Sequence, residues 1–107
     1  MLKKINRLSK RSEFDEVKKT GKLKQYPLFG WLFLKKGDKE KKFGFIISKK
    51  ISKKAVDRNR IKRLMAEILR KNLDKFEEGT RGIFLVKKSM LGVEMKELAE
   101  EVKKIIL

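Results

Sequence analysis

The longest hydrophobic segment of the chain, residues 28–34, is apolar at every position except Gly30. Successive side chains of an extended strand point to opposite faces, so both faces of this segment are apolar. Pro27 has no backbone N–H to donate and is typical of a strand start or an edge strand. The pattern therefore predicts a strand that is covered on both sides, with Phe29, Trp31 and Phe33 on one face and Leu28, Leu32 and Leu34 on the other.

The remaining pattern predicts two more strands and three helices. A charged hairpin loop with a turn at Gly37-Asp38 leads to a strand at about 43–48, and a third strand spans 82–87. Residues 12–21, 55–72 and 93–106 have helical spacing, with Ser12 as a cap of the first helix. The order predicts one α+β domain over residues 1–107, with helices packed on a single sheet. If the strands at 43–48 and 82–87 are parallel, the helix between them is expected to cross over in the right-handed sense.

The helix predicted at 55–72 has two distinct faces when its residues are placed about 100° apart. One arc is apolar and predicts contact with the sheet: Ile61, Leu64, Met65, Ile68 and Leu69. The adjoining arc is basic and contains no acid: Arg58, Asn59, Lys62, Arg63 and Arg70. The planar guanidinium group of arginine can bind two phosphate oxygens at once, and the asparagine amide both donates and accepts hydrogen bonds. Ala66 lies within the basic arc, where it predicts a flat spot that a nucleic acid could approach closely.

Charge makes a polyanionic partner the natural expectation. The chain has 31 Lys and Arg against 14 Asp and Glu, a formal net charge of +17, and self-repulsion of this size favours such a partner. A second basic block precedes the helix at the end where backbone N–H groups attract anions: Lys49, Lys50, Lys53 and Lys54. Nucleic acid is favoured over a membrane surface, because the helix already needs its apolar face for the sheet. It is also favoured over a merely solvated helix, which usually mixes charges of both signs.

Several classes of protein are excluded by what the chain lacks. It has no Cys and no His, so disulfides and imidazole-dependent catalytic triads are absent. No apolar run approaches the roughly 18 residues of a membrane span, and the basic N-terminus lacks the apolar region of a secretory signal. A cytoplasmic location is expected. A nuclease with carboxylate-bound magnesium would need several converging acids, of which Asp57 is the one candidate.

The segment SKKISKKAVDRNRIKRLMAEILR resembles the signature of the bacterial ribonuclease P protein subunit. In that family a strand ends in Ser-Lys-Lys and the next helix carries R-N-x-x-K-R, matched here by Arg58, Asn59, Lys62 and Arg63. The resemblance extends over most of the chain, including Asn6-Arg7-Leu8, Phe14 and Gly21. It implies an α/β sandwich of order αβββαβα with a mixed sheet of about four strands. It also implies a left-handed βαβ crossover in place of the right-handed one.

The resemblance further implies the protein subunit of an endoribonuclease whose catalytic RNA removes the 5′ leader of precursor tRNA. No protein-borne active site and no covalently bound cofactor are expected, and magnesium ions would act through the RNA. Contact with the catalytic RNA is expected at Arg58, Asn59, Arg60, Lys62, Arg63, Arg70, Lys53 and Lys54. A cleft between the first helix and the sheet is expected to hold the leader at Phe14, Lys18, Leu32, Lys49, Lys50 and Arg7. Phe14 could stack on a base or simply pack the helix onto the sheet.

Three positions depart from the family pattern. Lys18 and Leu32 stand where an aromatic residue is often found, and Ala66 stands where an arginine is common, with Arg70 one turn further on able to compensate. One alternative from a different class stays open, a non-catalytic ribosomal or ribosome-associated RNA-binding protein. Dependence of function on a 5′ leader would discriminate between the two.

Overall fold

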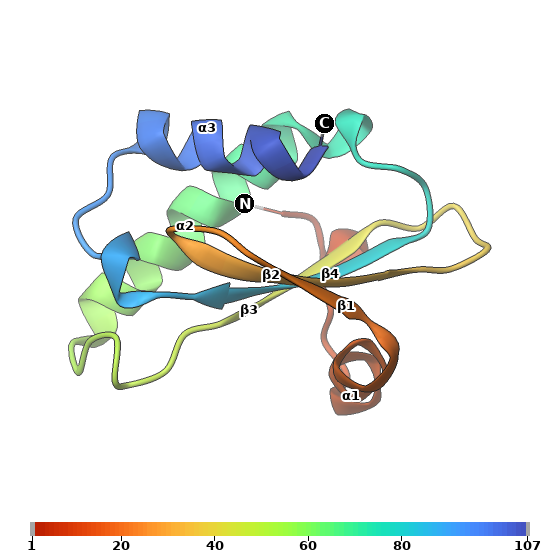
Figure 1. Cartoon of the computed structure of the whole chain (residues 1–107), viewed down its shortest axis with the longest axis horizontal. Coiled ribbons are helices and arrows are strands. Elements are labelled where there is room, and N and C mark those ends of the chain that lie inside the picture. Colours follow the sequence, from red (N-terminus) through yellow and green to blue (C-terminus); the bar gives the residue numbers. More distant parts are fainter. Residues whose placement is uncertain (1, 107) are drawn as a thin grey trace.

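Four strands form one mixed sheet in the order β1-β2-β4-β3, with helices on both faces (Figure 1). The computed structural model describes residues 2–106. The helices are α1 (Arg11–Thr20), α2 (Ala55–Lys71) and α3 (Met95–Ile106), and the strands are β1 (Lys22–Gln25), β2 (Phe29–Lys35), β3 (Lys42–Ile46) and β4 (Thr80–Val86). Short 3₁₀ turns lie at Lys4–Asn6, Leu73–Lys75 and Lys88–Met90. The predicted α+β domain and the order αβββαβα are confirmed.

The sheet combines antiparallel and parallel pairs. β2 pairs antiparallel with β1 and with β4, whereas β3 pairs parallel with β4, so that α2 is the connection of a βαβ unit. The hand of this crossover, left-handed according to the resemblance, stays a prediction. All four residues of β1 are exposed, and the hydrophobic pattern did not reveal this strand because it buries no side chain.

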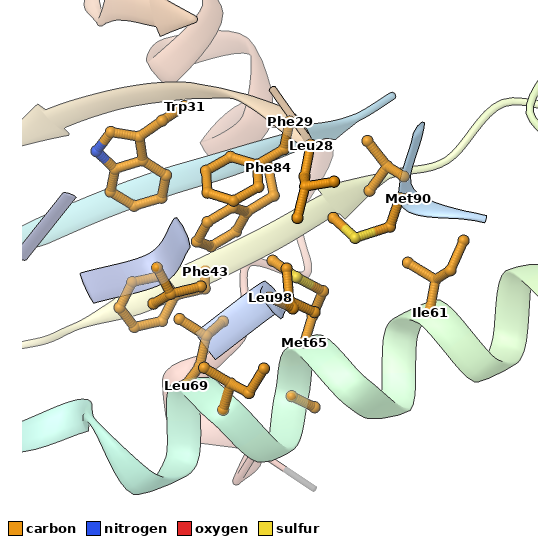
Figure 2. Packing of buried hydrophobic residues seen from close by; sticks show 14 of the residues in the cluster. Leu28, Phe29, Trp31, Phe43, Ile61, Met65, Leu69, Phe84, Met90 and Leu98 are labelled. Atoms are coloured by element: carbon orange, nitrogen blue, oxygen red, sulfur yellow. The ribbon is translucent and has the colours of Figure 1, made fainter. Parts of the chain in front are cut away.

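One face of the sheet is covered by α2 and α3 and holds the main core. Phe29 and Trp31 of β2 and Phe84 of β4 pack there against Met65 of α2 and Leu98 of α3 (Figure 2). The prediction that Phe29, Trp31 and Phe33 share a face is therefore confirmed. The placement of Leu28 on the opposite face is wrong, since it lies in this same core. Leu28 precedes β2, so the alternation of the strand does not apply to it.

The opposite face of the sheet carries α1. Val17 of α1 packs with Leu8 and Ile83, and the half-buried Phe14, Leu32 and Leu34 join this cluster. Two ion pairs hold α1 near the loop between β2 and β3, Glu13 with Lys42 at 3.1 Å and Glu16 with Lys36 at 2.8 Å. The prediction of a hairpin at this loop is wrong, because β4 lies between β2 and β3 in the sheet. On β1, Leu23 is 50% exposed, so part of the sheet beyond α1 is open to solvent.

Glu13 closes the N-terminus of α1. The carboxylate of Glu13 accepts the backbone N–H groups of Ser9 and Lys10 at 3.3 and 3.2 Å. The prediction of Ser12 as the cap is wrong, because the helix begins one residue before it, at Arg11. A glutamate in the first turn is long enough to reach back to the preceding backbone N–H groups, which is the second half of a capping box.

Candidate nucleic-acid interface

The α2 helix packs its apolar stripe inward and turns most of its basic residues outward. Ile61, Met65, Ile68 and Leu69 are buried and Leu64 is half-buried, which confirms the predicted core face. We call Arg58, Asn59, Lys62, Arg63 and Arg70 the basic arc. All of them are exposed except Arg58, which is half-buried. The arc therefore presents amide and cationic groups to solvent along one side of the helix.

Ala66 does not form the predicted flat spot on this arc. It is only 7% exposed and belongs to the hydrophobic cluster that also contains Leu2. A methyl side chain lies close to the helix axis, so neighbouring residues cover it easily. Lys62 and Arg63 nevertheless stay exposed. Approach to the helix is therefore through long basic side chains and not through its backbone.

Arg60 lies away from the basic arc. Its Nη2 donates a hydrogen bond to the backbone oxygen of Val93 at 3.1 Å, in the segment that leads into α3. Two residues along a helix are separated by roughly 160° when measured the short way round, so Arg60 and Lys62 point in different directions. Arg60 thus lies on the α3 side of the helix, one turn before Arg63.

Arg70 belongs to the basic arc but is paired with an acid of the same helix. Its Nη2 lies 2.6 Å from Oε1 of Glu67, and its Nε donates to Oε2 at 3.3 Å. The hydrogen bond from Arg70 lowers the pKa of Glu67 and raises the pKa of Arg70. The charge of Arg70 is therefore partly compensated before any partner arrives.

The four lysines before α2 lie on a loop that is tied to the start of the helix by Ser52. The Ser52 hydroxyl donates to Oδ2 of Asp57 at 2.8 Å and accepts the backbone N–H of Lys54 at 3.1 Å. The backbone oxygen of Ser52 accepts Nη1 of Arg58 at 2.7 Å. Lys49, Lys50, Lys53 and Lys54 are all exposed, and we call them the lysine loop.

Sequence reasoning missed the role of Ser52 and considered Asp57 only as a metal ligand. A serine just before a helix, followed by an aspartate in the first turn, was the signal that could have revealed this contact. Arg58 likewise has a structural contact, although a guanidinium has five N–H donors and can also bind a phosphate.

Phe14 and Leu32, two of the residues predicted to form the leader cleft, pack in one cluster between α1 and the sheet. Phe14 lies directly on Gly44, since a Cβ atom at Gly44 would be 2.6 Å from two atoms of the phenyl ring. Phe14 and Leu32 are half-buried in the same cluster. Phe14 thus packs α1 onto the sheet and keeps part of its ring accessible. Lys18 of α1 is exposed. Arg7, which forms an isolated backbone bridge with Phe43 of β3, is exposed as well.

Neither a metal centre nor a membrane span is found in the part of the chain that the structure describes. Within residues 2–106, no three Asp or Glu side chains are arranged to hold a metal ion. No helix in that range is long and apolar enough to cross a membrane. Asp57 is therefore not part of such a group of acids within residues 2–106.

The fold and the sorted charge define an α+β protein whose exposed helix face suits the phosphate backbone of RNA. The sequence model of the family described as Ribonuclease P matches residues 2–107. The chain belongs to this family, that of the bacterial ribonuclease P protein components.

Relatives of known identity agree in sequence and in structure. The ribonuclease P protein component of Nitratiruptor sp. is 34% identical over 105 residues, which cover 98% of this chain and 93% of that protein. The ribonuclease P protein component of Fusobacterium nucleatum is 37% identical over 95 residues, which cover 88% of this chain and 83% of that protein. The solved structure of the ribonuclease P protein from Thermotoga maritima has a TM-score of 0.84 at 28% identity and covers 94% of each chain.

Family membership establishes the role of the chain in outline. It is a protein subunit of ribonuclease P, an endoribonuclease in which the RNA carries out catalysis. Association with ribonuclease P RNA and precursor tRNA follows in general terms. The subunit role predicted from the sequence is confirmed, and the comparisons do not support the alternative of a ribosomal protein.

Proposed function

We propose that the basic arc, together with Lys53 and Lys54 of the lysine loop, binds ribonuclease P RNA. The α1 side of the sheet, with Lys49 and Lys50 of the same loop, binds the 5′ leader of precursor tRNA. The observation that carries the proposal is the sorting of charge on α2. Asn59, Lys62 and Arg63 are exposed side by side, and the exposed lysine loop continues the same positive surface. Such a surface releases counterions when it neutralises phosphates, and this supplies much of the affinity for RNA.

The residues of the RNA-binding surface contribute unequally under this proposal. Lys62 and Arg63 are exposed and make no ion pair within residues 2–106, so both can pair directly with phosphates. Arg58 acts partly through the backbone of Ser52, and Arg70 competes with its own partner, Glu67. Arg60 would extend the contact toward α3. Lys53 and Lys54 would add charge beside the N-terminus of α2.

The leader-binding part of the proposal rests on Phe14 and the charges around it. Single-stranded RNA favours positively charged grooves with an aromatic residue on which a base can stack. The half-exposed ring of Phe14 offers that stacking surface, with Leu32 packed in the same cluster. Lys18, Arg7, Lys49 and Lys50 would attract the leader phosphates. With Lys18 in place of a second aromatic residue, the contact depends more on charge and less on stacking.

Under this proposal, magnesium ions act through the RNA partner. A protein with a formal net charge of +17 neutralises RNA phosphates that would otherwise need divalent ions, so it lowers the magnesium concentration that the complex requires. The cytoplasmic location expected from the sequence stays a prediction.

Cleavage of precursor tRNA by a bacterial ribonuclease P RNA at low magnesium tests the proposal. The rate is measured with and without the protein, and with the double variant Lys62→Ala/Arg63→Ala. Lys96→Ala/Lys103→Ala is the matched control, because it removes the same charge from exposed positions on α3. A second substrate has its leader shortened to one nucleotide.

We expect strong rescue by the native protein, loss of rescue in the α2 variant and little change in the α3 control. The benefit of the protein should also shrink on the short-leader substrate, and Phe14→Leu should remove part of the remaining leader dependence. Equal losses of rescue in the α2 and α3 variants would mean that the protein assists cleavage through its net charge alone. That result would contradict the assignment of the basic arc.

A further inference from the structure

A cavity of about 270 Å³ lies on the side of the sheet opposite α1, beside the C-terminal end of α3. Trp31 and Phe33 of β2 line it together with Tyr26 and Phe76, and Ile105 and Ile106 contribute from α3. Neither the basic arc nor the predicted leader cleft shares any of these residues. The cavity is therefore separate from both surfaces discussed above.

Two nearly parallel aromatic rings of β2 form an aromatic wall of this cavity. The rings of Trp31 and Phe33 have centroids 5.7 Å apart and lie within 13° of parallel. Trp31 is only 4% exposed, whereas Phe33 is half-exposed. Figure 2 shows the indole nitrogen of Trp31 on the side of the ring away from Phe29 and Phe84. Phe33 can thus offer a ring face to a ligand while Trp31 supports it from behind.

Lysines surround this aromatic wall. Lys24, Lys35, Lys75 and Lys104 all line the cavity, and Glu77 is the acid among its lining residues. Lys35 pairs with Glu77, and Lys104 lies 3.1 Å from Glu101. Lys24 and Lys75 make no ion pair within residues 2–106. The Nζ atom of Lys24 lies 5.8 Å from the centroid of the Phe33 ring, so a cation is already placed next to the ring face.

An aromatic wall with a cationic rim selects a planar ligand that carries negative charge. A positively charged ligand would be repelled by the lysines, and an aliphatic one could not stack on the ring of Phe33. The cavity is slightly smaller than the roughly 300–1,000 Å³ typical of sites for drug-sized ligands, which suits one base rather than a longer segment. Base–aromatic stacking with basic groups on the phosphates is how proteins hold unpaired nucleotides.

We propose that this cavity binds a single nucleotide, with its base against Phe33 and its phosphate held by Lys24 and its neighbouring lysines. The nucleotide comes either from solution or from an unpaired position in an RNA strand. This proposal does not depend on the leader-binding proposal, because the two sites lie on opposite faces of the sheet.

Trp31 is the chain's one tryptophan, so its indole N–H gives a single NMR signal that reports on the cavity. The full chain is titrated with adenosine 5′-monophosphate, adenosine, inorganic phosphate and a single-stranded oligoadenylate of six nucleotides. We expect a saturable shift with the monophosphate, a much weaker response to adenosine and none to phosphate alone. Phe33→Leu should weaken binding of the monophosphate by about fivefold to a hundredfold, the range expected for the loss of one stacking contact.

Lys24→Ala should also weaken binding, and more so at low salt. Leu91→Ala, at an exposed apolar position outside the cavity, is the control and should leave the titration unchanged. A shift with the monophosphate alone assigns the site to free nucleotides, and a shift with both ligands assigns it to an RNA strand. The proposal is overturned if neither ligand shifts the signal. It is equally overturned if Phe33→Leu and Lys24→Ala, each shown to be folded by its NMR spectrum, bind as the native chain does.

Discussion

Nη2 of Arg81 lies 2.6 Å from Oδ2 of Asp38, and this ion pair ties β4 to the loop between β2 and β3. Arg81 is 6% exposed, and its Nη1 donates to the backbone oxygen of Glu40 at 3.0 Å. The sequence predicted a charged loop here, but not that it passes from one side of β4 to the other or that it is attached to a buried arginine. The pair lies at the end of the sheet where β2 ends and β4 begins, outside the proposed RNA-binding surface.

Replacing Arg81 by methionine should destabilise the fold without changing the affinity for RNA. The substitution removes hydrogen bonds of a charged group to Asp38 and Glu40, and we expect the free energy of unfolding to fall by about 2 kcal/mol. Urea denaturation measures the change. The double variant Arg81→Met/Asp38→Asn should lose less than the sum of the single variants, because both remove the same interaction. Strict additivity would show that the pair contributes nothing to stability.

The free energy of unfolding should decrease at acidic pH, partly because Asp38 and Glu13 become protonated. The hydrogen bond from Arg81 lowers the pKa of Asp38 below its ordinary value of 3.8. For Glu13, burial raises the pKa, but hydrogen bonds from Lys42, Lys10 and Ser9 together outweigh it, so the pKa lies below the ordinary 4.5. Both groups have lower pKa values folded than unfolded. Their stabilisation is therefore fully present above the unfolded values and is lost as the pH falls through the folded ones.

We accordingly expect the free energy of unfolding of Glu13→Gln to depend less steeply on pH below about 4.5 than that of the native chain. Urea denaturation at a series of acidic pH values tests this. Glu78→Gln is the control, since Glu78 is exposed and makes no ion pair within residues 2–106. If Glu13→Gln and Glu78→Gln flatten the profile equally, the contacts of Glu13 have no special part in acid unfolding.

Ser52→Ala should weaken RNA binding while leaving its salt dependence intact. The variant loses the contacts that hold the lysine loop against α2, so the lysines must be ordered when the RNA binds. We expect an affinity loss of about three- to tenfold, equivalent to one or two ordinary hydrogen bonds. Lys62→Ala removes a charge instead, so the slope of log affinity against log salt should decrease by about one.

Binding measured at several salt concentrations separates the two effects. Ser12→Ala, at an exposed serine of α1, controls for the loss of a hydroxyl. A reduced salt slope in Ser52→Ala would mean that the lysines no longer reach the phosphates. An unchanged slope in Lys62→Ala would remove Lys62 from the interface.

Glu67→Gln should strengthen binding to ribonuclease P RNA. It removes a negative charge beside the basic arc and releases Arg70, which Glu67 otherwise pairs through two hydrogen bonds. We expect an affinity gain of about two- to fivefold at low salt, the size of one exposed ion pair, and a smaller gain at high salt. In the native chain, Arg70→Ala should cost less affinity than Arg63→Ala. A larger loss for Arg70→Ala would show that RNA displaces Glu67 without difficulty.

Local patterns in the sequence determined the class of fold, the main core face and the position of the basic helix. The alternation around Trp31 and the helical spacing from Ile61 to Leu69 are properties of consecutive residues, and burying such stripes leaves few arrangements. The run from Arg58 to Arg63 likewise sorts its charge through helix geometry alone. The family signature then supplied the function, since its residues lie next to one another in the chain.

Only the tertiary structure decided what distant segments do to individual side chains. Ala66 is buried and Arg60 turns toward Val93, because each depends on which neighbouring segment comes close. The cavity at Trp31 and Phe33 is a similar case, since β2 and α3 meet there although they are far apart in sequence. A pattern of single residues carries no information about such contacts, whose geometry is set by the packing of the whole sheet and its helices.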